Sequence, residues 1–304
     1  MLCRCLFMRQ WPVTISVASL IFVLLNFKMD PKPSNSTDWD VIVFTQRWPV
    51  TICSQWLKAN INNSCLMPTD NSIWTVHGIW PTKSGTRGPW NCNKIHFNES
   101  SISEIESDLK KYWINIENNT KPTSFWEHEW DKHGTCAMIL PALNTELNFF
   151  RKGLEWNKAF NLREMLLSRS IMPSSSGYTI ERIYNSVRNA INHNPIMQCV
   201  VDKDTKESLL SEIQICLDRS FNVIDCDPVK GFFENVIQAG NVLTDCSLKK
   251  VVVYPSHTSL TDGLTEPDVI LETNIQSTLD ALLESRNYWI TIYKTIKFLI
   301  WATI

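Results

Sequence analysis

The spacing of hydrophobic residues along the chain predicts strands as well as helices. Ile213, Ile215 and Leu217 occur at every second position, which is the period of a β-strand. Residues 40–44 and 249–254 are short runs rich in valine, and such runs are also typical of strands. The sequence therefore predicts at least three strands.

Four other segments have the spacing of an amphipathic helix. In the first, Ser101 and Glu104 form a capping box ahead of an apolar face. That face consists of Ile102, Ile105, Leu109 and Tyr112. The other three segments cover residues 145–156, 162–168 and 180–191. Neither a repeat nor a parallel βαβ rhythm is visible, so we expect an α+β fold in which helices flank an antiparallel sheet.

An apolar run also marks the N-terminus. Arg4 and Arg9 precede hydrophobic residues 11–27, and the run ends at Lys28. A positive segment followed by an apolar run is typical of a signal peptide, so residues 1–28 are expected to direct export. A retained signal anchor is the alternative, because the run is long and no clean small-residue cleavage site follows it.

Residues 257–304 form a C-terminal extension with a different pattern. Residues 269–283 suit an amphipathic helix, and the seventeen residues 288–304 are apolar apart from two lysines. This last stretch is a poor membrane span, although a helix lying at a membrane interface would fit it. We expect membrane contact only if one of the terminal apolar segments is retained. A poorly ordered extension is the alternative.

Length and charge limit the class of protein. The chain has 304 residues, of which 44% are hydrophobic, so it can bury a full core. Residues 38–256 are expected to form one domain with appended ends, and a monomer is expected. The formal net charge of -2 excludes a broadly basic surface, so any affinity for nucleic acid must be local.

Two short segments, residues 74–81 and 125–136, hold three of the six histidines. If the second segment is a helix turning by about 100° per residue, four of its ionisable side chains fall within a sector of roughly 140°. These side chains are His128, Glu129, Lys132 and His133. One face of the predicted helix then presents two imidazoles, a carboxylate and an ammonium group.

A mixture of charges can also be an ordinary solvated helix face. Glu129 and His133 could then form no more than a weak i,i+4 pair. Three large aromatic residues interleaved with the charges argue against full solvation: Phe125, Trp126 and Trp130. Charged groups beside buried aromatic residues are where pKa values shift.

The pair His128-Glu129 also invites comparison with the zinc motif H-E-x-x-H. The second histidine comes one residue late, at His133, and Lys132 would place a positive charge beside the cation. We therefore expect no metal site in this segment.

The first segment supplies a third histidine. His77 is followed by Gly78, which permits a backbone conformation or a close approach denied to other residues. Taken alone, His77 would be interpreted as a core histidine at the end of a strand. Together with the second segment, it becomes a candidate for proton transfer.

These two segments resemble the paired active-site motifs of the ribonuclease T2 family of secreted acid ribonucleases, most of all its animal branch. The resemblance covers most of residues 38–255. Outside the two segments it includes the opening strand at Gln46-Arg47-Trp48-Pro49 with Cys53, the first helix end at Tyr112-Trp113, and the closing strand at Val253-Tyr254-Pro255. It implies the family's disulfide-stabilised α+β fold.

Each ionisable group has a role in the chemistry that the resemblance implies. RNA cleavage needs a base for the ribose 2′-hydroxyl, an acid for the leaving 5′-oxygen and positive charge near the phosphorane. By resemblance, His133 is the general base and His77 the general acid, although these two roles could be reversed. His128 is then a phosphate ligand, and Lys132 with Glu129 stabilises the transition state. The implied products are a 2′,3′-cyclic phosphate and then a 3′-phosphate.

The resemblance also implies how substrate is bound. RNA is the expected partner, no cofactor is required, and DNA should be inert because it lacks the 2′-hydroxyl. Gln46, Trp80 and Thr82 are the implied substrate-binding residues, with Trp80 at the family's base-stacking position. Many members carry an aspartate where this chain has Thr82, so we expect a broad base preference.

The cysteines fit an exported protein. Ten are present, and the eight outside the leader allow 105 pairings, so the connectivity does not follow from the sequence alone. The resemblance implies the pairs Cys53–Cys65, Cys92–Cys136, Cys199–Cys246 and Cys216–Cys226.

Four glycosylation sequons point to the same compartment, at Asn35, Asn62, Asn98 and Asn118. We expect the protein outside the cell, or in the lumen of the endoplasmic reticulum or of a lysosome-type compartment. The alternative to an enzyme is a secreted glycoprotein that uses the fold as a scaffold for partner binding. A scaffold has no need of all five ionisable groups in the two segments.

Overall fold

The computed structural model describes residues 38–86, 88–232 and 235–256. The expected signal segment, the sequon at Asn35 and the C-terminal extension lie outside these residues. Within the described ranges, no helix combines the length and the apolar character needed to cross a membrane.

The described residues form one mixed sheet of nine strands. The strands are β1 (Val41–Arg47), β2 (Thr75–Thr82), β3 (Ser174–Tyr178), β4 (Ile196–Val201), β5 (Ser208–Asp218), β6 (Val223–Ile224), β7 (Ile237–Ala239), β8 (Val242–Thr244) and β9 (Val252–Tyr254). Six of them follow the order β2-β1-β5-β4-β8-β7. The expected α+β class is confirmed, although the β4–β8 and β5–β9 pairs are parallel and the other pairs antiparallel.

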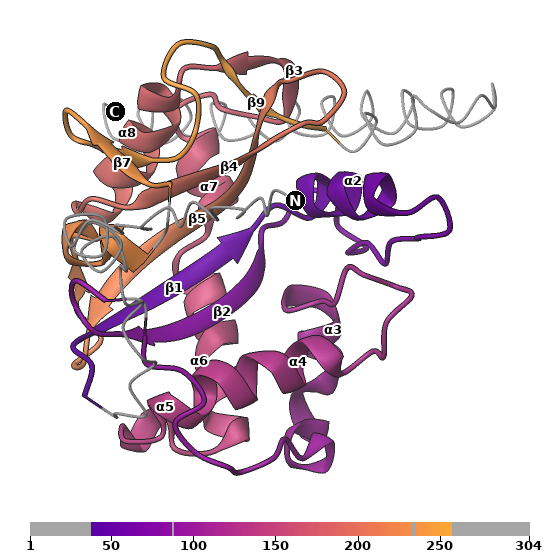
Figure 1. The fold of residues 1–304 in the computed structure, drawn as a ribbon, viewed down its shortest axis with the longest axis vertical. Coiled ribbons are helices and arrows are strands. Elements are labelled where there is room, and N and C mark those ends of the chain that lie inside the picture. The colour runs from indigo at the N-terminus through magenta and orange to yellow at the C-terminus, as the bar shows by residue number, and fades with distance from the viewer. Residues whose placement is uncertain (1–37, 87, 233–234, 257–304) are drawn as a thin grey trace, which may run out of the picture.

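Helices lie on both sides of this sheet. They are α2 (Pro49–Ala59), α3 (Glu106–Tyr112), α4 (Ser124–Glu129), α5 (Thr135–Ala137), α6 (Glu146–Ala159), α7 (Leu162–Leu167) and α8 (Ile180–Ile191), with 3-10 turns η1 (Glu99–Ile105), η3 (Pro141–Leu143) and η4 (Asp227–Phe232) and a π-turn η2 (Trp130–Gly134). Helices α3 to α6 gather beside β2, whereas α7 and α8 lie at the other end of the sheet near β3 and β9 (Figure 1).

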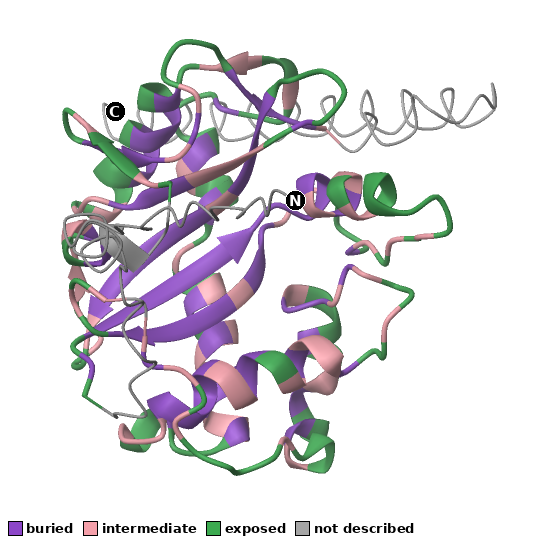
Figure 2. Ribbon diagram, viewed as in Figure 1, coloured by how far each residue is buried: buried purple, intermediate pink, exposed green. Residues whose placement is uncertain are grey.

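Strand β1 is buried on both faces, which explains the four consecutive apolar residues at its start. Val41 and Val43 pack into a hydrophobic cluster that includes residues of α7 and α8. Ile42 and Phe44 pack into a second cluster, formed with residues of α3, α4 and α6. Strand β1 therefore joins two cores and pairs with β2, and both strands are buried along most of their length (Figure 2).

Most predicted elements are present with small changes in their bounds. Helix α8 spans residues 180–191 as predicted, and the Thr179 side chain caps its N-terminus. Thr145 caps α6 in the same way. Strand β9 is shorter than the predicted run 249–254, because it begins only at Val252.

The predicted capping box of Ser101 and Glu104 is wrong. The chain begins with the 3-10 turn η1, which Asn98 caps with its own side chain. The Ser101 hydroxyl donates to the Asn98 carbonyl oxygen and to the Glu146 carboxylate, and Glu104 pairs with Arg151 of α6. Contacts with α6 therefore override the local signal.

Four disulfides lie within the described residues, and they are the pairs that the resemblance implies: Cys53–Cys65, Cys92–Cys136, Cys199–Cys246 and Cys216–Cys226. Cys92–Cys136 joins the loop after β2 to α5. Beside it, the Asn91 backbone N–H donates to the Lys132 carbonyl oxygen at 2.9 Å. Because a disulfide typically contributes 2–4 kcal/mol, these links hold the two histidine-bearing segments firmly together.

Candidate active site

His77 is the extra residue of a β-bulge in strand β2. Thr45 pairs with Gly78 and Gln46 pairs with Val76, so no residue of β1 pairs with His77. A bulge redirects the side chain of the extra residue, and bulges are common next to active sites. The bulge therefore releases His77 from the alternation that buries its neighbours in the strand.

The His77 side chain is 27% exposed and lies between two carboxylates. Its Nδ1 is 2.6 Å from Oε1 of Glu212 on β5, and its Nε2 is 3.9 Å from Oε1 of Glu129. The ring also packs against Phe125 and Trp80, with centroid separations of 5.7 and 4.9 Å. Both ring nitrogens therefore have an acidic neighbour within an aromatic frame.

Gly78 allows the second segment to approach β2 closely. A Cβ atom at this position would lie 2.1 Å from Oε2 of Glu129 and 2.2 Å from Nε1 of Trp80. These two atoms are joined by a 2.9 Å hydrogen bond, in which the indole N–H donates. The close approach expected at Gly78 is confirmed, and the groups that approach are Glu129 and Trp80.

The second segment is not a regular α-helix. Helix α4 ends at Glu129, the π-turn η2 follows, and α5 completes the segment. A π-turn closes its hydrogen bonds over one more residue than an α-helix, so later side chains are displaced around the axis. Glu129 and His133 are buried, whereas His128 is exposed. The predicted single charged face is therefore wrong, because it assumed regular α-helical geometry.

Glu129 is the buried carboxylate of the site, with a relative exposure of 1%. Burial raises its pKa, while the charge of His77, the hydrogen bond from Trp80 and the charge of Arg47 act in the opposite direction. Burial has the larger effect. Glu129 therefore accepts a proton more readily than an ordinary glutamate at mildly acidic pH.

His133 is buried next to Trp80, with a relative exposure of 4% and ring centroids 5.4 Å apart. Its Nδ1 has no hydrogen-bond partner among the described residues. Burial, followed by the charges of Lys132 and His128, lowers the pKa of His133 well below its ordinary value. His133 is therefore neutral over a wide pH range and has a nitrogen free to accept a proton.

Because folding keeps His133 neutral, we expect acid to destabilise the wild-type protein more than a His133→Phe variant. The unfolded chain protonates this histidine near pH 6.5 and the folded chain only at lower pH, so stability is lost as the pH falls below 6.5. Each pH unit in this window costs about 1.4 kcal/mol, or roughly 3–6 °C in melting temperature. Thermal unfolding followed by circular dichroism between about pH 7 and 5 measures the effect. Equal slopes of melting temperature against pH in both proteins would contradict it.

His128 and Lys132 lie close to this group of residues, and Lys132 supplies an ammonium charge. A cleft of about 450 Å³ is lined by residues that include His77, His128, Arg47 and Glu212. Burial, followed by the charges of Lys132 and His77, lowers the pKa of the partly exposed His128. The cleft therefore presents imidazoles and a nearby ammonium group to any anion that enters it.

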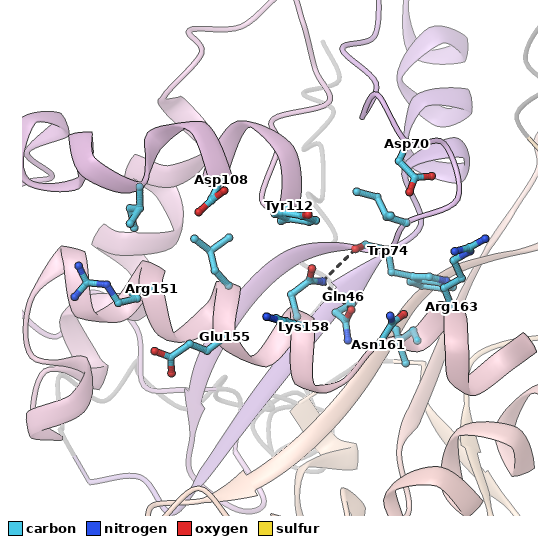
Figure 3. A pocket seen from close by; sticks show the side chains of 15 residues that line it. Gln46, Asp70, Trp74, Asp108, Tyr112, Arg151, Glu155, Lys158, Asn161 and Arg163 are labelled. Carbon is cyan, nitrogen blue, oxygen red and sulfur yellow. Dashed lines mark hydrogen bonds between the residues drawn. The ribbon is translucent and has the colours of Figure 1, made fainter. Parts of the chain in front are cut away.

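The three residues expected to bind substrate are not among those lining this cleft. Trp80 is 6% exposed, and Thr82 is fully buried with its hydroxyl donating to the Trp80 carbonyl oxygen. Gln46 lies in a separate groove of about 670 Å³ between α3 and α6 (Figure 3). There its carboxamide donates to the Phe160 carbonyl oxygen and accepts from Asn157. All three side chains make contacts within the fold, and Trp80 packs against His77, which lines the cleft.

Two charged residues of the site have no recognisable signal in the sequence. The Arg47 guanidinium lies over the Phe125 ring, 4.1 Å from its centroid, and donates to the Ile114 carbonyl oxygen at 2.7 Å. Glu212 pairs with Arg47 across β1 and β5. Strand register brings these two residues together, and neither hydrophobic pattern nor motif spacing reveals it.

Comparison with known families matches residues 39–226 to the Ribonuclease T2 family. Ribonuclease Oy of Magallana gigas is 39% identical over 194 residues, which cover 62% of this chain and 88% of that protein. Ribonuclease T2 of Danio rerio is 36% identical over 192 residues, which cover 62% of this chain and 74% of that protein.

A solved structure shares the same fold. The crystal structure of RNase NT in complex with 5′-AMP aligns with a TM-score of 0.58 and 28% sequence identity. The alignment covers 72% of this chain and 99% of that one. These matches extend the likeness from the two motifs to most of the described residues.

Proposed function

The chain belongs to the ribonuclease T2 family, and from that premise we propose that it is a metal-independent endoribonuclease acting on single-stranded RNA. Cleavage proceeds by transesterification to a 2′,3′-cyclic phosphate, followed by hydrolysis to a 3′-phosphate. The observation that supports this proposal is the meeting of His77, Glu129 and His133 from two distant segments around the Trp80 side chain. Neither segment alone supplies both proton-transfer groups.

The two histidines have different environments, and this difference supports different roles. His133 is held neutral by burial, which suits a general base that takes the proton of the 2′-hydroxyl. His77 has Nδ1 on the Glu212 carboxylate, which leaves Nε2 as the nitrogen of a general acid that protonates the leaving 5′-oxygen. Each such proton transfer typically contributes about 10² to 10⁴ in rate.

The remaining groups stabilise charge on the phosphate. His128 lines the cleft as a phosphate ligand, and Lys132 supplies positive charge to the phosphorane. Glu129, whose pKa is raised by burial, holds Trp80 in place and lies beside the acid His77. Base preference is broad, because the buried Thr82 hydroxyl is engaged by the Trp80 carbonyl oxygen.

Incubation with single-stranded homopolymers in EDTA tests the proposal. We expect an unchanged rate on removal of divalent metal, 2′,3′-cyclic ends on early products and no cleavage of DNA. The cleavage rates of the four RNA homopolymers should differ by less than about a hundredfold, which corresponds to about 2.7 kcal/mol in activation free energy. Activity lost in EDTA and restored by a divalent metal would contradict the mechanism.

The four disulfides indicate a protein of the secretory pathway. Within it, we place the mature enzyme outside the cell or in the lumen of the endoplasmic reticulum or a lysosome-type compartment. The sequon residues Asn62, Asn98 and Asn118 are all exposed, which supports their use as glycosylation sites.

A further inference from the structure

We propose that Glu212 is a positioning residue for the reaction, and that it fixes the tautomer and the orientation of His77. Its Oε1 lies 2.6 Å from Nδ1 of His77, whereas the other ring nitrogen, Nε2, lies on the side of Glu129. An ionised carboxylate can only accept a hydrogen bond, so Nδ1 must carry the proton. This inference rests on the ribonuclease function proposed above, because His77 is the general acid of that reaction.

Glu212 remains ionised although it is almost buried, with a side-chain exposure of 13%. Burial raises its pKa, but the charge and hydrogen bond of His77, together with the charge of Arg47, lower the pKa overall. Burial also lowers the pKa of Arg47 to about 10, with Glu212 and Glu129 opposing that shift. Arg47 is therefore still charged at mildly acidic pH and helps to keep Glu212 anionic.

A chain of hydrogen bonds holds the Glu212 side chain in one position. Gln214, two residues along β5, approaches Oε2 of Glu212 with its Nε2 at 3.4 Å. The same amide group donates to Gln198 of β4 at 2.6 Å, and Gln198 in turn reaches Asp245. The carboxylate that meets His77 is therefore fixed by side chains from two central strands.

The backbone of His77 is fixed independently. The Trp113 indole donates to the His77 carbonyl oxygen at 3.0 Å, and the bulge sets the direction of the side chain. These contacts leave rotation of the imidazole about its side-chain bonds as the remaining freedom. Glu212 removes that freedom, and it keeps Nε2 on the side where the leaving oxygen must be protonated.

The test compares Glu212→Ala and Glu212→Gln with Glu207→Gln. Glu207 is an exposed carboxylate just before β5 that does not line the cleft, so its variant removes an equal charge away from His77. We expect Glu212→Ala to lower kcat about 10- to 100-fold with little change in KM, as is typical when the partner of a functional histidine is lost. Glu212→Gln should lose less, because its amide oxygen can still accept from Nδ1. Glu207→Gln should stay near the wild-type kcat.

Nitrogen-15 NMR of the His77 ring supplies a readout that does not depend on activity. In the wild type, neutral His77 should show protonated Nδ1 and unprotonated Nε2, and Glu212→Ala should shift the ring toward a mixture of tautomers. A wild-type kcat or an unchanged tautomer in folded Glu212→Ala would overturn the proposal, and so would a neutral wild-type His77 that carries its proton on Nε2. If the wild-type protein cleaves no RNA, the ribonuclease function fails, and the tautomer still decides the role of Glu212.

Discussion

Replacing His77 or His133 with phenylalanine is expected to reduce kcat for RNA cleavage by a factor of about 10² to 10⁴, because each substitution removes one proton transfer. Phenylalanine suits both places sterically, since His77 packs on Phe125 and Trp80 and His133 packs on Trp80. The measurement is kcat and KM on a dinucleotide substrate at mildly acidic pH.

An exposed histidine outside the cleft gives the matched control. His96→Phe should retain wild-type kcat, since His96 is solvent-exposed and does not line the cleft. The double variant of His77 and His133 should be little worse than either single variant, because the two groups act in one reaction. His77→Phe also leaves Glu212 without its partner, so thermal unfolding must show that the variant is folded during the assay. Full activity of either single variant would refute the assigned roles.

Substitution of Gly78 by alanine is expected to lower kcat about a hundredfold, although Gly78 itself performs no chemistry. The new Cβ would overlap the two atoms of the Trp80–Glu129 hydrogen bond, so the carboxylate has to move away from His77. Loss of one aligned electrostatic group in an active site commonly costs about 10² to 10³ in kcat. Overpacking should also cost about 1–3 kcal/mol of stability.

A second glycine separates loss of stability from loss of chemistry. Gly177 has φ of +65°, and a Cβ there would lie 2.8 Å from the Val252 carbonyl oxygen, so Gly177→Ala also strains the fold. That contact joins β3 to β9. We expect Gly177→Ala to lower the melting temperature with a near-normal kcat at temperatures where it is folded. Equal losses of kcat in both variants would show that Gly78 acts only through stability.

Local signals in the sequence predicted helices well where the neighbouring structure agrees with them. Helices α8 and α6 lie where their hydrophobic spacing predicts them, and the structure adds a threonine cap to each, from Thr179 and Thr145. Ser101 and Glu104 carry an equally good local signal, but Glu146 and Arg151 of α6 bind them instead. A capping motif competes with long-range partners, and a single sequence does not show where those partners are.

The alternation of apolar residues in β5 predicted the strand, but it did not predict that both faces of the strand are buried. Ile213, Ile215 and Leu217 are buried as a half-exposed strand would require, but Gln214 and Cys216 between them are buried as well. Clusters on both faces of the central strands account for this. An alternating pattern indicates one buried face of a strand, and it gives no information about burial of the opposite face.

The motif resemblance pointed to two segments that lie side by side in the structure. The orientation of each side chain depends on the local backbone geometry, which the motifs do not show. The bulge at His77 and the π-turn after Glu129 are departures from regular structure, so regular periods could not predict them. Glu212 lies far from His77 in the sequence. The two residues become neighbours only through the register of β5 against β1 and the register of β1 against β2. The burial of Gln46 and Thr82 depends on the packing around β1 and β2, which the motif spacing does not show.

The bulge in β2 has a consequence for how this segment can change in evolution. Deleting one residue near His77 would restore a regular ladder with β1, and the histidine would then follow the ordinary inside and outside alternation of the strand. Exchanges of side chains within the segment leave the bulge in place, whereas a change of length removes it. The number of residues between Trp74 and Trp80 is therefore as much a part of the motif as the residues themselves.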